Sequence, residues 1–158
     1  MKIQVKTPKS QFMGYVKKKM DEIVEKAIAF LIEVGRDAYN AQMDTRKSAG
    51  VYLSQTGNLQ SSTGYSVLYK GKVVFSAGFE PTTEGTEQGA TGINEGKAFM
   101  QELIQQYQNA DLALIFCAGM KYGIYVEKLH NLNVLTTAEL VADKRIREVN
   151  SILKQLNG

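Results

Sequence analysis

The chain has 158 residues and contains very little cysteine, histidine and proline. Its single cysteine, Cys117, excludes an internal disulfide and is typical of proteins that fold in a reducing compartment. With only one histidine, His130, the chain cannot assemble a zinc site from these two residue types. Two prolines and 22% charged residues argue against disorder.

The sequence also lacks any long apolar run. The longest, residues 112–118, is far too short to span a bilayer. Residues 1–10 contain lysines but no apolar run, so we do not expect them to form a signal peptide. A net charge of +3 gives little support for a dedicated nucleic-acid binder. Hydrophobic residues make up 44%, enough for one core, so residues 1–158 are expected to form a single soluble domain with no membrane partner.

The strongest periodic pattern covers residues 12–44. Apolar side chains recur at three- and four-residue steps, and lysines, arginine and acidic residues occupy the other face: the apolar set is Val16, Met20, Ile23, Val24, Ala27, Ile28, Leu31, Val34, Ala38 and Tyr39. This pattern predicts one helix about 50 Å long at a rise of ~1.5 Å per residue. Such a helix either bends near Gly35 or reaches beyond the domain to touch a partner.

The remaining elements alternate between strand and helix patterns. The expected order is a strand at 1–6, a loop at 46–58, a hairpin of 65–70 and 73–77 turning at Lys70–Gly71, an exposed loop at 80–92, a helix at 95–109, a buried strand at 111–118, a strand at 124–126, and a last helix opened by the capping box Thr136–Glu139. The fold class is α+β. We expect a small, mainly antiparallel sheet of three to four strands, with the long N-terminal helix, the middle helix and the C-terminal helix on one face.

Two segments deserve comparison with known chemistry. Gly92–Lys97 precedes a helix, but a nucleotide phosphate loop needs glycine at position 91 and a hydroxyl at 98, where this chain has Thr91 and Ala98. Cys117 and His130 could in principle act as nucleophile and base, as in a hydrolase. Because Cys117 lies in the most apolar segment, a buried and inert thiol is the favoured interpretation.

Three segments occur in an order that suggests a family. They are Thr56-Gly57-Asn58-Leu59-Gln60-Ser61-Ser62, then Ala118-Gly119-Met120-Lys121-Tyr122-Gly123-Ile124-Tyr125-Val126-Glu127, then Asn133-Val134-Leu135-Thr136-Thr137-Ala138 before a terminal helix. Together they resemble the neck and tail-completion (head–tail joining) proteins of tailed bacteriophages, over about residues 3–156. Gly123 and Lys128 depart from the family pattern, and residues 80–109 look like a loop-and-helix insertion within the domain.

The resemblance implies a structural subunit of a phage virion neck or tail. Such a subunit forms a ring that joins the capsid portal to the tail, and its partners are copies of itself and neighbouring neck, portal or tail proteins. DNA would pass through the ring without sequence-specific binding. The implied location is the virion, and the host cytoplasm during assembly. The resemblance implies no enzymatic activity, no cofactor and no metal.

Charge is distributed unevenly along the chain. Residues 1–19 hold six lysines and no acidic residue, whereas residues 80–111 hold six acidic residues and one lysine. Opposite charges of this kind would guide docking between ring neighbours, although both could simply be solvated surfaces. The interface candidates are Lys17, Lys18, Lys19, Glu84, Glu87, Glu95, Tyr122, Tyr125 and Glu127. The alternative function is a small cellular ligand-binding or interaction module with no catalytic activity.

Overall fold

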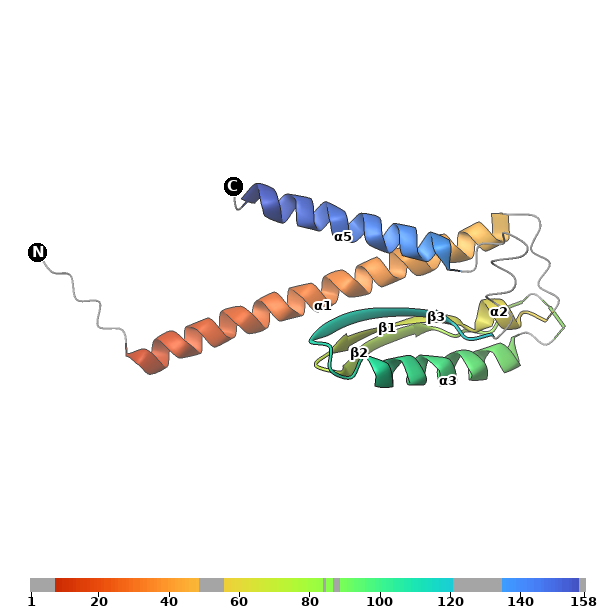
Figure 1. Ribbon diagram of the computed structural model, residues 1–158, viewed down its shortest axis with the longest axis horizontal. Coiled ribbons are helices and arrows are strands. Elements are labelled where there is room, and N and C mark those ends of the chain that lie inside the picture. The colour runs from red at the N-terminus through yellow and green to blue at the C-terminus, as the bar shows by residue number, and fades with distance from the viewer. Residues whose placement is uncertain (1–7, 49–55, 84, 87–88, 121–134, 157–158) are drawn as a thin grey trace, which may run out of the picture.

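A computed structural model describes residues 8–48, 56–83, 85–86, 89–120 and 135–156. Its elements are α1 (Lys9–Ser48), α2 (Asn58–Ser61), β1 (Thr63–Tyr69), β2 (Lys72–Gly78), α3 (Ala90–Gln106), β3 (Leu112–Ala118) and α5 (Thr136–Leu156). Figure 1 shows a small sheet between two helices, with α1 running well past the end of the sheet. The predicted α+β class is therefore confirmed. The strands expected at 1–6 and 124–126 lie outside the described residues.

The sheet is antiparallel and has the order β2-β1-β3. The predicted hairpin is confirmed, and its turn residues Lys70 and Gly71 have φ values of 50° and 71°. These left-handed conformations match the two-residue turns whose twist suits a hairpin. The register between β1 and β2 shifts after Val67, so that Val67 faces Phe75 and Leu68 faces Val73. Val74 is the extra residue of this β-bulge.

Helix α3 covers one face of the sheet. The core on this side consists of Leu68, Phe79, Met100, Ile115 and Cys117, with Ile93, Leu103, Ile104 and Ala113 packed against it. The register explains the set, because Leu68 pairs with Ala113 and both point to the α3 side. The segment interpreted as an insertion, residues 80–109, contains α3, the helix that covers one face of the sheet. That it is an insertion relative to a family stays a prediction.

Helix α1 covers the opposite face, which corrects the expectation that all helices share one face. Tyr65 and Val67 of β1 point to this side and are 2% and 0% exposed. The Tyr65 ring lies 6.1 Å from the ring of Tyr39 on α1 and 5.4 Å from that of Phe116 on β3. A sheet of three strands buries both faces only when helices cover both, so the two helices form outer layers around it.

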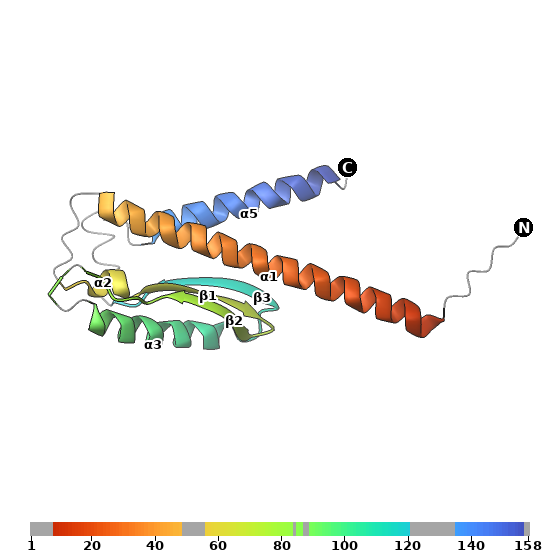
Figure 2. The same cartoon turned by 180° about the vertical axis from the view of Figure 1, so that it is seen from behind.

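Helix α1 is continuous from Lys9 to Ser48, and Figures 1 and 2 show it without a sharp kink, so the bend considered near Gly35 is not seen. Gly35 instead permits close contact with the sheet. A Cβ atom at this position would lie 2.5 Å from Cδ2 of Tyr65 and 3.2 Å from Cδ1 of Leu114. The helix also extends beyond the predicted range 12–44 at both ends.

Helix α5 packs along α1 and not on the sheet. The backbone N–H of Ala138 donates to Oε1 of Gln42, a side chain with 0% exposure, at 3.1 Å. Arg145 and Asp37 form an ion pair one to two turns further on, with 3.4 Å between Nε and Oδ2. Beyond this pair the two helices diverge (Figures 1 and 2), so the N-terminal part of α1 is left without a covering helix.

Two predicted boundaries were wrong. Helix α3 begins at Ala90 and ends at Gln106, not at 95 and 109, so the last three residues of the predicted loop 80–92 are helical. Thr82 and Gly89 in this loop are also buried. Among the helices of the described ranges, none combines the length and apolar character that a bilayer span requires.

Candidate functional site

The N-terminal half of α1 is an exposed helical arm, residues 9–31, which we call the arm. Figures 1 and 2 show it extending past the sheet, well clear of α3. Large apolar side chains on it are open to solvent: Phe12, Met13, Tyr15, Met20 and Ile23. Their exposed fractions run from 55% to 66%. Further along the same helix Val34 and Ala38 are completely buried, so one apolar side of α1 is covered at one end and open at the other.

Seven apolar positions of α1 have a strict heptad spacing. Steps of three and four residues connect Met13, Val16, Met20, Ile23, Ala27, Phe30 and Val34, and each of these residues is apolar. This is the spacing of a and d positions in a helix that pairs with another helix. We call these seven positions the seam. The simple three- and four-residue periodicity already marked most of them, but only the structure shows which are uncovered.

Charge along the arm is divided into two blocks. Residues 9–20 contain Lys9, Lys17, Lys18 and Lys19 and no acid, a charge of +4. Residues 21–33 contain Asp21, Glu22, Glu25 and Glu33 with Lys26, so four negative charges and one positive charge give −3. Lys19 already contacts Glu22, with 2.8 Å between Nζ and Oε2, and lies 5.9 Å from the centre of the Tyr15 ring.

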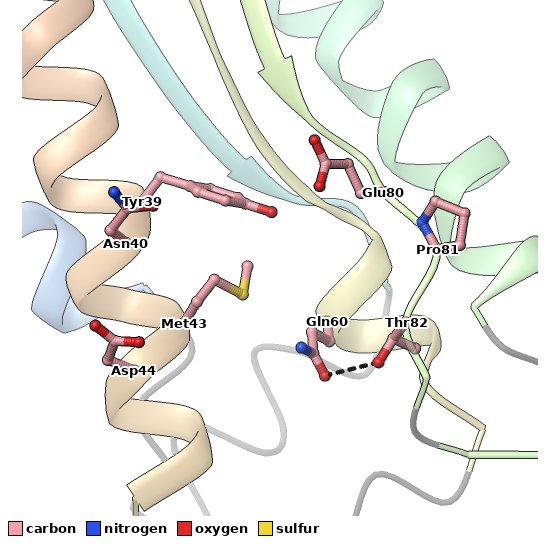
Figure 3. A pocket seen from close by; sticks show the side chains of 8 residues that line it. All are labelled: Tyr39, Asn40, Met43, Asp44, Gln60, Glu80, Pro81 and Thr82. Carbon is pink, nitrogen blue, oxygen red and sulfur yellow. Dashed lines mark hydrogen bonds between the residues drawn. The ribbon is translucent and has the colours of Figure 1, made fainter.

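A polar pocket of about 350 Å³ lies at the other end of α1. Figure 3 shows α1 forming one wall, with α2 and the segment after β2 forming the other. The lining residues are Tyr39, Asn40, Met43, Asp44, Gln60, Glu80, Pro81 and Thr82. Gln60 and Thr82 are joined by a hydrogen bond of 3.3 Å, which ties the two segments of the second wall together. Among the described residues that line the pocket are two carboxylates and no cationic side chain, so this lining favours a polar or positively charged group.

Gly92 and Gly96, which belong to the segment compared with a phosphate loop, allow close packing between α2 and α3. The backbone N–H of Gly92 donates to Oδ1 of the buried Asn58 at 3.0 Å. A Cβ at Gly92 would lie 2.7 Å from the Asn58 backbone, and one at Gly96 would lie 2.5 Å from the carbonyl oxygen of Ser62. Both glycines therefore face the protein interior, where they allow α3 to approach the Thr56–Ser62 element.

Cys117 is 1% exposed, so its predicted burial is confirmed. Its Sγ lies 3.8 Å from the carbonyl oxygen of Gly96, in the core under α3. Burial raises the pKa of the thiol to about 12, which leaves it protonated at neutral pH. A thiol in this state is a poor nucleophile. His130, its hypothetical partner, lies outside the described residues.

The interface candidates fall into three groups. Lys17, Lys18 and Lys19 are exposed on the arm, and Glu95 is half-buried on α3. The lysines lie on α1 and Glu95 lies on α3, and these two helices cover opposite faces of the sheet (Figure 1). The others lie outside the described residues: Glu84, Glu87, Tyr122, Tyr125 and Glu127.

Within the described part of the chain, no three His, Cys, Asp or Glu side chains gather closely enough to hold a metal ion. Comparison of the chain with protein-family models, with curated proteins and with solved structures found no match.

Proposed function

We propose that this protein is a structural subunit of a phage virion neck or tail, which forms a ring joining the capsid portal to the tail. The observation that carries the assembly part of this proposal is the arm. A helix that projects from its own domain with open apolar side chains is costly to leave in water and suits contact with another subunit. The ordered resemblance to neck and tail-completion proteins supplies the specific role.

Two further features support an assembly role. The basic interface candidates Lys17–Lys19 and the acidic candidate Glu95 lie on α1 and α3, two helices that cover opposite faces of the sheet. A ring subunit presents two different surfaces to its two neighbours. The Thr56–Ser62 element, part of the family resemblance, is buried against α3 and holds the sheet and helix together. In this proposal the protein acts through binding surfaces, with no catalytic step.

The test is direct observation of assembly. The purified protein is examined by native mass spectrometry and negative-stain electron microscopy, alone and with any portal and tail proteins that are encoded beside it. A closed ring of uniform subunit number, or incorporation into a portal–tail complex, is expected. A protein that forms neither with any of these partners would disprove the proposed function.

The pocket supports a second candidate, a small module that binds a polar ligand. Its carboxylates, Asp44 and Glu80, favour a ligand with a positive group such as an amine. Thermal-shift and calorimetric titration with small amines and, as a control, small carboxylates would test it. On this hypothesis, amines raise the melting temperature of the original protein but not that of Glu80→Gln. If neither amines nor carboxylates change the melting temperature, the hypothesis is rejected.

A further inference from the structure

We infer that the arm pairs with the arm of a second copy of this chain in antiparallel orientation, around a two-fold axis between Asp21 and Glu22. The inference goes beyond the proposed ring, because a two-fold contact joins subunits in pairs and a ring needs a different contact between neighbours. It rests on three observations about the arm: an uncovered seam, a self-complementary register and a self-complementary charge pattern.

The seam is open where such a pairing would be centred. Met20 and Ile23 are 61% and 66% exposed, and Met13 near the end of the arm is 55% exposed. Val16, Ala27 and Phe30 are half-buried. Beyond the ion pair of Arg145 with Asp37, helix α5 turns away from α1 (Figure 1).

The seam can pair with the seam of a second copy in an antiparallel register that is two-fold symmetric. When residue numbers of the two copies sum to 43, each a position meets a d position. The layers then join Met13 to Phe30, Val16 to Ala27, and Met20 to Ile23, each occurring twice. Every layer joins two apolar residues, and the overlap is about 26 Å at ~1.5 Å per residue.

The charge blocks select the antiparallel orientation. In this register residues 9–20, at +4, lie over residues 23–34 of the second copy, where Glu25, Lys26 and Glu33 give −1, and Asp21 faces Glu22 across the axis. In a parallel pair, the positive block would lie over the positive block of the second copy and the negative block over the negative block, and both contacts would be repulsive. Opposite charge of this kind specifies orientation and association rate more than affinity, and it identifies a second copy of this chain as the occupant.

The first test measures self-association of the full chain by sedimentation velocity over a concentration series. Ile23→Asp places a charge in the central layer at a residue that is already exposed, so folding is retained. It is expected to weaken the two-fold association by tenfold or more, given the ~1.5–3 kcal/mol for burying an isoleucine and ~1.4 kcal/mol per tenfold. Leu140→Asp is the matched control, because Leu140 is 64% exposed on α5 and away from the seam. It should associate like the original protein.

The second test fixes the orientation by disulfide crosslinking. Val16→Cys and Ala27→Cys are prepared as separate proteins, in which Cys117 stays buried. In the antiparallel register, residue 16 lies about 16 Å along the axis from residue 16 of the second copy, at ~1.5 Å per residue. A disulfide requires Cα atoms within about 7 Å. A mixture is expected to give the mixed crosslink, and each protein alone is expected to give none.

The outcomes separate this inference from the proposed function. A wild-type chain that stays monomeric, equal weakening by Ile23→Asp and Leu140→Asp, or self-crosslinking of Val16→Cys would overturn the inference. A mixed crosslink with no ring under any condition would support the inference and reject the proposed function. A ring that persists in Ile23→Asp while pairing is lost would support both.

Discussion

Gly35 of helix α1 lies directly against the ring of Tyr65 in strand β1. A Cβ atom at Gly35 would lie 2.5 Å from Cδ2 of the ring, and the ring itself is 2% exposed. Tyr65 also contacts the rings of Tyr39, Phe75 and Phe116, with centroids 5.4–6.1 Å away. The aromatic cluster therefore attaches the long helix to the sheet, and a residue without a side chain at position 35 allows the approach.

The first prediction is that Gly35→Ala destabilises the fold by ~1–3 kcal/mol, because the new methyl group overpacks the contact with Tyr65. Gly14→Ala is the matched control, since Gly14 lies in the same helix and a Cβ there would meet no atom within 4 Å. It is expected to stabilise α1 by ~0.5–1 kcal/mol through helix propensity. Urea denaturation followed by circular dichroism measures both, and equal effects at the two sites would contradict the proposed contact.

The second prediction concerns the Cys117 thiol. In the folded protein its pKa is raised by burial from 9.0 to about 12, so the thiol contributes stability below pH 9 and that contribution is lost as pH rises toward 12. Between pH 9 and pH 11 the free energy of unfolding should therefore fall more for the original protein than for Cys117→Ala.

Labelling of Cys117 by a thiol reagent at pH 8 should be slow until urea unfolds the chain. Ser151→Cys, at an exposed position, should react at once and shows that the reagent is active.

The third prediction tests the contact between α2 and α3. Asn58→Ala removes the acceptor for the Gly92 N–H and leaves this buried donor unpaired, which is expected to cost ~1–3 kcal/mol. Asn94→Ala, at an exposed position of α3, serves as the control and should change stability by less than ~0.5 kcal/mol. If the glycines of this segment served phosphate binding instead, ATP would raise the melting temperature of the original protein, and we expect no such shift.

The fourth prediction concerns the lysines of the arm. Reversing Lys17, Lys18 and Lys19 to glutamate should weaken assembly at low salt and have less effect at high salt, because screening acts over ~8–10 Å near physiological ionic strength. Lys19 should matter least, since it already pairs with Glu22. If assembly of the lysine-reversed protein is restored by also changing Glu84, Glu87 and Glu95 to lysine, the lysines pair with these residues of a ring neighbour. If assembly is restored by mixing it with a second protein in which Asp21, Glu22 and Glu25 are changed to lysine, the pairing is between arms. Assembly unchanged at low salt would exclude both uses of these charges.

Much of the secondary structure was predictable because it depends on local patterns. The apolar periodicity of α1, the two-residue turn at Lys70–Gly71 and the continuous apolar strand β3 each follow from neighbours in the chain. The burial of Cys117 was predictable for the same reason, since its segment has no polar residue between Leu112 and Ala118. The lysines of the arm were also expected to be exposed, and they are.

The start of α3 and the roles of the glycines were not predictable from local sequence. Gly35 suggested a bend and Gly92 was assigned to the loop 80–92, because glycine disfavours a helix interior. Gly92 and Gly96 also prompted the comparison with a phosphate loop. Each of these glycines in fact accommodates a neighbour distant in sequence: Tyr65 for Gly35, Asn58 for Gly92 and Ser62 for Gly96. Such contacts override propensity, and their partners are known only once the chain is folded.

The sequence by itself determined the α+β class, the presence of one long N-terminal helix and the division of charge along its arm. These properties depend on composition and on periods of two to four residues. Only the tertiary structure decided that α1 and α3 cover opposite faces of the sheet and that α5 turns away from α1. The reason is that an apolar stripe specifies burial but not its partner. Val34 and Ile23 belong to the same seam, and contacts from β1, β3 and α5 bury the first and leave the second exposed.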